Sequence, residues 1–452
     1  MKDLYSKNSI SKIWDQPFTI PEAVPDTADV VIIGGGIIGV STAWFLAKQG
    51  INVVLCEKGH LAGEQSGRNW GWVRVQGRDT REIPMVLESM QIWEGLKKEI
   101  GEDVGFVRGG CFYTASSEKE LEKREAWLEI AKQHGINTRL IDSKELKKLV
   151  NGSGLDWAGA MYTESDARAE PHLAVPAISR AAINKGAKIY TACAVRGLET
   201  SGGSVSAVIT ESGTIKTSTV LCAAGSWTSM FCRSLGIKIP QLKVLGTVVR
   251  TAPTIKILDG ALFGNNLGVR LRQDGGYTVA HGSVFDHSIT PSSFIFLSDF
   301  LPTLLKNMRH IRLSLGKPFI DEFALLNNWR LDEMSPFEKV RVLNPPPSSK
   351  ALKAIRKNLD LMFPDLSSTP FEETWGGMIE TTPDVIPVID SVNTLPGFYV
   401  ATGFSGHGFG IGPGAGKAIA NLLSGRKSEI DISEFRLSRF FDGSSIEAQG
   451  FV

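Results

Sequence analysis

The stretch DVVIIGGGIIGVSTAWFLAKQGINVVLCE, residues 29–57, decides the fold of this chain. An apolar run leads into the pattern Gly34-x-Gly36-x-x-Gly39, an expected helix follows, and a second apolar run ends in Glu57. Strand, glycine turn, helix, strand and acid stand in the order of a unit that binds a dinucleotide. Many glycine turns match the short pattern by chance, and this ordered context is what gives it weight.

Each glycine of the pattern has a physical task. Gly34 allows the tight turn, Gly36 lets the backbone approach a pyrophosphate, and Gly39 lets the helix pack against the strand. The N-terminus of the helix offers free N–H groups and the positive end of its dipole to phosphates. Glu57 lies 21 residues after Gly36, close to the roughly 20 expected for a carboxylate that binds ribose hydroxyls. These features predict a Rossmann-like unit.

Size and composition describe an ordinary globular protein with more than one domain. The chain has 452 residues and exceeds the roughly 250–300 at which single cores stop growing. Apolar residues make up 42%, charged residues 21%, and the formal net charge is +1, so nothing indicates nucleic-acid binding. The cysteines are odd in number and lack C-x-x-C spacing, so we expect reduced thiols and no metal site. They are Cys56, Cys111, Cys193, Cys222 and Cys232.

The first 27 residues are polar and dotted with prolines. They contain no apolar segment of the kind that signal peptides carry. We therefore expect an N-terminal arm and a cytoplasmic protein, with peripheral contact to the inner face of a membrane left open.

A second strand and glycine-rich turn stand near the C-terminus. GFYVATG, residues 397–403, precedes FSGHGFGIGPGAG, residues 404–416, and we expect a helix from Lys417 to Leu423. A chain that begins and finishes its nucleotide-binding domain at opposite ends must thread a second domain through its middle. We predict an α/β fold (two-domain α+β), in which a Rossmann-like domain is interleaved with a substrate domain built mainly on an antiparallel sheet.

The expected division of the chain follows from these signals. It consists of an N-terminal arm (1–27), a discontinuous nucleotide-binding domain (28–82, 160–236 and 376–452) and a substrate domain (83–159 and 237–375) with a helical insertion at 291–330.

Two stretches in the middle of the chain carry candidate functional side chains. In GVRLRQDGG the residues Arg270 and Arg272 precede an expected hairpin turn and, being two apart, point to one face of their strand. FIFLSDFLPTLLKNMRHIRLSL, residues 294–315, is apolar and then basic, with an uncharged run too short to span a membrane. It is open to interpretation as a buried helix, a partner-docking surface or an interfacial helix.

Together these features resemble the superfamily of FAD flavoproteins that includes D-amino-acid oxidase, glycine oxidase and sarcosine oxidase. The turn Gly403–Phe409 is similar to one that sarcosine oxidases place near the flavin. The sequence is more similar still to the bacterial membrane-associated L-amino-acid deaminases, in AGEQSGR (Ala62–Arg68), Leu331-Asp332-Glu333, Trp375-Gly376 and other pieces from Ala28 onward.

The resemblance implies FAD, bound without a covalent link, because residues 373–390 lack the cysteine that sarcosine oxidases use. The loop Gly63–Arg68 and the turn Gly408–Gly412 would flank the flavin, and Val195 would hold the adenine through its backbone. The implied cofactor-binding residues are Gly34, Gly36, Ile37, Ile38, Gly39, Glu57, Lys58, Gly63, Gln65, Ser66, Gly67, Arg68, Val195, Ala224, Gly225, Trp227, Gly406, His407, Gly408, Phe409, Gly410 and Ile411.

The substrate anchors of the relatives are matched less fully. Gly410 replaces the carboxylate-binding lysine of sarcosine oxidases, and residues 376–383 lack the arginine of D-amino-acid oxidases. The L-amino-acid deaminases use an arginine before the middle hairpin turn. We therefore expect Arg272, and Arg270 as second choice, to bind a substrate carboxylate as a bidentate fork. In the alternative interpretation these arginines form salt bridges on the sheet surface.

His407 and the run after the flavin loop are further candidates for the substrate pocket. His407 stands where the deaminases have tryptophan; it would line the pocket and favour a neutral amine, or merely hydrogen-bond backbone. Trp70, Trp72, Arg74 and Gln76 alternate along the chain, and either roof the pocket or belong to the core.

The resemblance implies an enzyme that oxidises the C–N bond of a small-molecule α-amino acid to an imino acid, which hydrolyses to a 2-oxo acid and ammonia. Electrons would pass to O2 or to a quinone of a respiratory chain. Two alternatives stay open: the same chemistry on a secondary amine (sarcosine, a proline derivative or an opine), and an FAD subunit that relies on a partner in a hetero-oligomer. A nicotinamide dehydrogenase is disfavoured, because the return strand into Ala223-Ala224-Gly225 and the C-terminal unit suit an extended FAD better.

Overall fold

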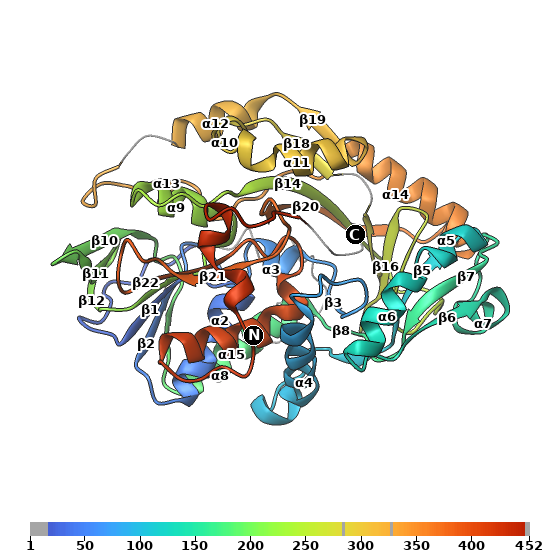
Figure 1. The fold of residues 1–452 in the computed structure, drawn as a ribbon, viewed down its shortest axis with the longest axis horizontal. Coiled ribbons are helices and arrows are strands. Elements are labelled where there is room, and N and C mark those ends of the chain that lie inside the picture. The colour runs from blue at the N-terminus through green and yellow to red at the C-terminus, as the bar shows by residue number, and fades with distance from the viewer. Residues whose placement is uncertain (1–16, 283–284, 326–328, 448–452) are drawn as a thin grey trace.

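Two large sheets organise the protein in the computed structural model, which describes residues 17–282, 285–325 and 329–447 (Figure 1). One sheet has six strands in the order β21-β22-β13-β1-β2-β9, and the other has ten. Two three-stranded sheets complete the β structure. The predicted α/β fold class is confirmed.

The six-stranded sheet draws its strands from both ends of the chain. Its central strands are parallel, and β21 runs antiparallel to β22 at the edge. The first two strands are buried along their whole length, as expected for a parallel sheet covered on both faces. The strands are β1 (Val30–Ile33), β2 (Val53–Cys56), β9 (Lys188–Tyr190), β13 (Val220–Cys222), β21 (Val388–Ser391) and β22 (Phe398–Thr402).

The helices α2 (Ile37–Lys48), α8 (Pro171–Asn184) and α15 (Gly408–Leu423) pack beside one another below this sheet (Figure 1). The expected start of the last helix at Lys417 is wrong, because the glycine-rich stretch is itself helical from Gly408. A β carbon on Gly412 would lie 2.6 Å from the side chain of Ile37 on α2, so the glycines let the two helices approach closely.

The ten-stranded sheet is mostly antiparallel, as predicted for the second domain; β15 with β5 and β18 with β19 are its parallel pairs. The expected boundaries at 159/160 and 375/376 fall inside β7 and β20, because both strands pair within this sheet. The strands are β5 (Cys111–Ala115), β6 (Thr138–Asp142), β7 (Gly159–Thr163), β14 (Leu242–Thr251), β15 (Ala261–Gly264), β16 (Leu267–Leu271), β17 (Tyr277–His281), β18 (Phe285–Ser288), β19 (Ile311–Ser314) and β20 (Phe371–Thr381).

The remaining elements are short or peripheral. The small sheets contain β10 (Val195–Ser201), β11 (Ser204–Thr210) and β12 (Gly213–Lys216), and β3 (Trp72–Val73), β4 (Val107–Arg108) and β8 (Ala167–Arg168). The helices are α3 (Gln65–Arg68), α4 (Ile83–Ile100), α5 (Glu118–Glu122), α6 (Glu125–Gln133), α7 (Ser143–Leu149), α9 (Thr228–Ser234), α10 (Pro291–Ile295), α11 (Leu297–Asn307), α12 (Lys317–Leu325), α13 (Pro336–Lys339) and α14 (Ser349–Met362).

The insertion α10–α12 crosses the top of the molecule in Figure 1 and is not a buried helix. On α11 the side chains of Leu297, Leu301 and Leu305 are 49%, 44% and 62% exposed, and Phe300 points inward. Among the described helices, none is at once long and apolar enough to cross a membrane. Of the expected N-terminal arm, residues 1–16 lie outside the described residues, and Thr27 bridges to Lys216.

Candidate active site

A cavity of about 980 Å³ is lined from both large sheets. Its volume lies near the upper end of the roughly 300–1,000 Å³ typical of ligand sites. The predicted residues that line it are Gly34, Gly36, Ile37, Ile38, Glu57, Lys58, Gly63, Gln65, Ser66, Arg68, Val195, Ala224, Gly225, Trp227, Gly406, His407, Gly408 and Phe409. Gly39, Gly67, Gly410 and Ile411 are not among the lining residues.

The first glycine turn has room for a ligand and none for side chains. Gly34 has φ +114°, and a β carbon on it would lie 2.4 Å from the carbonyl oxygen of Ala223. A β carbon on Gly39 would lie 2.0 Å from the carbonyl oxygen of Gly34. A glycine is therefore needed at position 39 for the helix to pack against the turn. The N–H of Ile37 donates to the Ser66 hydroxyl at 2.9 Å, which joins the turn to the expected flavin loop. This cradle fits a dinucleotide pyrophosphate.

Glu57 ends β2 at the edge of the cradle. Its carboxylate accepts hydrogen bonds from the backbone N–H groups of Gly35 and Gly59, both at 2.7 Å. Burial raises the pKa of Glu57, and the neighbouring Lys58 opposes that rise. The position fits the expected ribose site, and the role stays a prediction.

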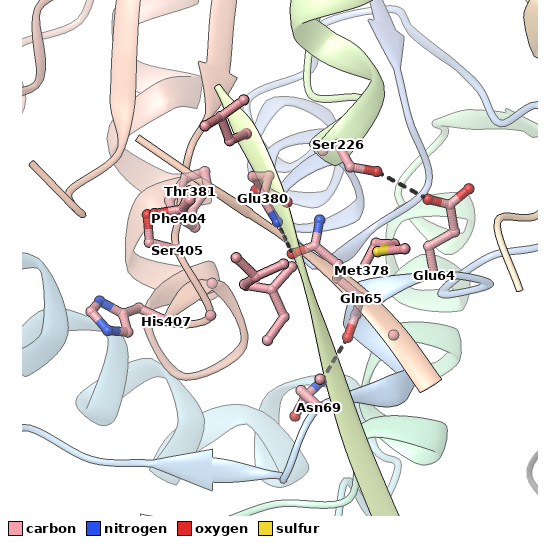
Figure 2. Close-up of a pocket in the computed structure, with 18 of the residues that line it drawn as sticks. Glu64, Gln65, Asn69, Ser226, Met378, Glu380, Thr381, Phe404, Ser405 and His407 are labelled. Carbon is pink, nitrogen blue, oxygen red and sulfur yellow. Dashed lines mark hydrogen bonds between the residues drawn. The ribbon is translucent and has the colours of Figure 1, made fainter. Parts of the chain in front are cut away.

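Glu64 lies in the expected flavin loop Gly63–Arg68 and lines the cavity, although it was not among the predicted cofactor-binding residues. Its carboxylate accepts from Lys58 at 2.8 Å, from the Trp227 indole at 2.9 Å and from the backbone N–H of Leu343 at 3.1 Å. Figure 2 shows Glu64 and His407 at opposite sides of the drawn residues, with Gln65 and Glu380 between them. The carboxylate thus fixes Lys58 and Trp227, two of the predicted cofactor-binding residues.

Neither Arg272 nor Arg270, the residues expected to bind the substrate carboxylate, lines the cavity. Arg270 is 1% exposed, and its Nη1 donates to the Glu170 carboxylate at 2.8 Å. Arg272 is 4% exposed and donates to Asp274 at 2.9 and 3.0 Å. Although burial opposes it, Arg272 lowers the pKa of Asp274 to about 2. The salt-bridge interpretation holds for both arginines: the Arg270–Glu170 pair is buried, and the pair of Arg272 with Asp274 reaches the surface through the aspartate.

Two other arginines, Arg74 and Arg78, do line the cavity. Arg78 is 5% exposed, and its Nη1 is buried without a hydrogen-bond partner among the described residues. Burial and the neighbouring Arg74 lower the pKa of Arg78 to about 10. Asp166 holds their loop by accepting from the N–H groups of Val75, at 2.7 Å, and Gln76, at 3.3 Å. Arg74 belongs to the run expected either to roof the pocket or to lie in the core. Arg78, two residues after Gln76 in the same alternation, was not among the candidates.

His407 follows the Phe404–Ser405 turn and lines the cavity (Figure 2). Of the two alternatives for its ring, the position at the cavity agrees with a pocket-lining residue, and Nδ1 contacts the Glu82 carboxylate at 3.1 Å. Burial and the charge of Arg78 lower the pKa of His407. A lowered pKa favours the neutral form of the ring.

The walls of the cavity combine aromatic surface with a buried acid, Glu380. Trp70, Trp72, Tyr113 and Phe263 all line it. Glu380 on β20 is 3% exposed, and its Oε2 has no hydrogen-bond partner among the described residues. Burial raises the pKa of Glu380 to about 7. Unpaired groups of this kind fit a polar ligand such as a flavin nucleotide with its substrate.

Comparisons with known proteins point to one family. A family model described as FAD dependent oxidoreductase (DAO) matches residues 29–422. A solved L-amino acid deaminase from Proteus myxofaciens, in complex with anthranilate, is 33% identical with a TM-score of 0.89, over 94% of this chain and 96% of that one. Sarcosine oxidase subunit beta from Rhodobacter capsulatus is 24% identical over 96% of this chain and 93% of its own. Mitochondrial sarcosine dehydrogenase from Mus musculus is 24% identical, and the chain spans 42% of its length. The resemblance inferred from the sequence is confirmed.

Proposed function

We propose that this chain, which belongs to the DAO family of FAD-dependent oxidoreductases, oxidises the C–N bond of an α-amino acid to an imino acid. The imino acid hydrolyses to a 2-oxo acid and ammonia. Members of the family act on amino acids or secondary amines, and the chain is an enzyme of this kind. Among the described residues, four arginines line the cavity. Arg68 and Arg341 bind protein groups, and the observation that carries the choice of an amino acid is the presence of the other two, Arg74 and Arg78.

The two guanidinium groups supply the cation that a bound carboxylate needs. A carboxylate held out of water without a partner costs several kcal/mol. Arg78 has a buried Nη1 with no partner among the residues that the structure describes, so it can donate to a ligand without breaking a bond. A planar fork also fixes the carboxylate in one orientation, which holds the α-carbon in place. This role was expected of Arg272 and is here assigned to Arg78 and Arg74.

The bound FAD would supply the hydride acceptor for this oxidation. The chain binds the carboxylate, excludes water and keeps the amine neutral, and His407 faces the cavity where the amine would lie. Gly34, Gly36 and Glu57 would hold the nucleotide end of the cofactor.

Non-covalent attachment is supported by the positions of the cysteines. Among the cavity-lining residues that the structure describes, Cys56 is the sole cysteine, and it ends β2 beside Glu57, at the expected ribose end. Precipitation with acid is expected to release yellow cofactor into the supernatant, and colour retained in the pellet would show a covalent bond.

The substrate side chain meets aromatic surface. Trp70 and Trp72 pack edge to face at 5.6 Å between ring centroids, and Tyr113 and Phe263 add two further rings at 5.5 Å from each other. Such walls favour an apolar or aromatic side chain, because each ring buries a large apolar area.

A second candidate function is the same chemistry on a secondary amine. It is supported by the curated relatives, two of which are named for sarcosine and match more than nine-tenths of this chain. One of these is the beta subunit of an oxidase, which also keeps open the need for a partner chain.

One experiment separates these functions. The purified chain is incubated with an artificial electron acceptor and a panel of amino acids and N-methyl amino acids. Ammonia with a 2-oxo acid supports the proposed function, formaldehyde or methylamine supports the second candidate, and no turnover by a chain that holds FAD indicates a missing partner.

We also propose that the insertion contacts a membrane or a partner subunit, through which electrons pass from the flavin to the acceptor. Besides the leucines of α11, the insertion exposes Phe294, Leu313 and Leu315, which are 64%, 55% and 73% exposed. We refer to these six side chains as the apolar patch; large apolar side chains exposed together on one insertion mark an interaction surface. α11 also lines the cavity through Leu297, Phe300 and Leu304, so the patch adjoins the site.

A further inference from the structure

The imidazole of His407 has a buried carboxylate partner, Glu82. The Nδ1 atom of His407 lies 3.1 Å from Oε2 and 3.4 Å from Oε1 of this carboxylate. The side chain of Glu82 is 0% exposed, and that of His407 is 16% exposed toward the cavity it lines. A carboxylate removed from water in this way requires a donor, and the histidine provides it.

The packing of two helices fixes this contact. Glu82 is the N-terminal cap of α4, and His407 is the N-terminal cap of α15. On α4, the Ser89 hydroxyl at 2.7 Å and the Trp93 indole N–H at 3.0 Å both donate to the carbonyl oxygen of Gly410. The first turn of α15 is therefore held against α4, and the two caps meet.

The contact selects one tautomer of the histidine. A carboxylate accepts hydrogen bonds, so Nδ1 of His407 must carry the proton and donate to Glu82. In a neutral ring, Nε2 then has a lone pair. Within the described part of the chain no group hydrogen-bonds Nε2, and the ring borders the cavity.

We propose that Glu82 is a positioning residue, which holds His407 so that Nε2 takes a proton from the ammonium group of the substrate. In this step an N–H bond of the ammonium breaks, an Nε2–H bond forms, and the electron pair stays on the substrate nitrogen. Nothing is oxidised or reduced. The inference rests on the proposed function, since it needs an amine substrate.

The charges around the ring suit a group that is neutral before the transfer and charged after it. Arg78 and Arg74 disfavour the imidazolium, as does the positive end of the α15 dipole. Burial acts in the same direction, and Glu82 is the group that opposes them by stabilising the charged ring. Without Glu82 the ring would still reach the cavity but would be a weaker proton acceptor.

The test is the pH dependence of kcat/KM in the full-length, FAD-loaded chain. Near neutral pH we expect Glu82→Gln to lower kcat/KM by about 100-fold, the lower end of what general acid–base groups contribute. As the pH rises toward the pKa of the substrate ammonium, the difference in kcat/KM between wild type and variant should shrink by roughly tenfold per pH unit. The reason is that a growing share of the substrate is already a neutral amine, which needs no proton acceptor. Glu82→Asp, which keeps the charge, should recover part of the loss.

A matched control lies on the same pair of helices. Glu88 on α4 pairs with Lys417 on α15 at 2.5 Å and does not line the cavity. Glu88→Gln removes the same charge between the same helices and should leave kcat/KM within about twofold at every pH. A loss in Glu82→Gln that is the same at every pH, or that Glu88→Gln reproduces, would mean a structural role and overturn the proposal.

A second measurement needs neither turnover nor the folding of a Glu82 variant. In wild-type protein labelled with 15N-histidine, His407 should show the Nδ1-protonated tautomer, with its signals identified by their loss in His407→Asn. An Nε2-protonated ring would overturn the proposal. A wild-type chain that shows the expected tautomer but oxidises no amine would instead refute the proposed function, and the proton transfer with it.

Discussion

The buried arginines of this chain differ in whether a carboxylate of the protein pairs with their guanidinium group. Arg270, Arg272 and Arg439 each donate to a carboxylate, from Glu170, Asp274 and Asp384 respectively. Removing Arg270 or Arg439 leaves a buried acid without this partner, and removing Arg272 takes away one of the two arginines that pair with the exposed Asp274, so the first effect is on folding stability. Arg78 has an Nη1 that no described residue accepts, which leaves it for a ligand.

This difference predicts opposite results for two arginine variants. Arg78→Met should raise KM for amino acids by roughly 100-fold or more, because loss of a buried charge partner costs about 3–5 kcal/mol, with normal FAD content. The control Arg272→Met should lower thermal stability and change KM by less than about threefold. Steady-state kinetics and thermal unfolding of both variants decide the matter. An Arg272 variant with the larger rise in KM would restore the assignment made from the sequence.

The sequence revealed the nucleotide end of the site and not the substrate end. Gly34, Gly36 and Glu57 follow one another within a single strand–helix–strand unit, so their spacing carries the geometry. The partner of Arg270 is Glu170, 100 residues away, and that of His407 is Glu82, 325 residues away. Such contacts depend on how sheets and helices pack, and no local spacing encodes them.

At the scale of elements, α15 shows tertiary packing overriding helix propensity. Each glycine in a helix interior costs roughly 0.5–1 kcal/mol relative to alanine, which is why a turn was expected at 404–416. The helix forms because its glycines face neighbours too close for a side chain: a β carbon on Gly416 would lie 2.5 Å from Ser41 on α2. The cost is recovered in the close packing of α15 against the helix that begins at the nucleotide cradle.

Alanine substitutions of two helical glycines should therefore act in opposite directions. Gly416→Ala should destabilise the protein by about 1–3 kcal/mol, because overpacking must push α2 and α15 apart. It should also weaken FAD binding, since α2 starts at the cradle. Gly95 on α4 is exposed with nothing within 4 Å of a β carbon, so Gly95→Ala should stabilise by roughly 0.5–1 kcal/mol. Denaturant unfolding and FAD titration of both variants test this prediction. Equal changes in the free energy of unfolding for Gly416→Ala and Gly95→Ala would contradict the packing argument.

At the scale of the whole molecule, the chain threads between two sheets and leaves the insertion on the outside. The six-stranded sheet takes β1 and β22 from opposite ends of the chain, so its interleaved topology could be inferred from two glycine motifs. The exposure of the α11 leucines could not be inferred, because the same apolar pattern fits a buried helix. Whether a membrane or a partner subunit covers these leucines is a property of the whole assembly, which the pattern of a single helix does not encode.

The last prediction concerns that surface. Leu301 and Leu305 lie four residues apart on one face of α11, so Leu301→Glu with Leu305→Glu places two charges in the centre of the apolar patch. If the patch contacts lipid, the double variant should lose co-flotation with phospholipid vesicles and reduction of a quinone in them, while turnover with a water-soluble acceptor stays within about twofold, because no cavity-lining charge changes. Leu361→Glu on α14, whose leucine is 50% exposed outside the insertion, serves as the control and should behave as wild type. Wild-type protein that ignores vesicles, yet forms a complex with a partner chain that the double variant cannot form, would assign the patch to a subunit interface instead.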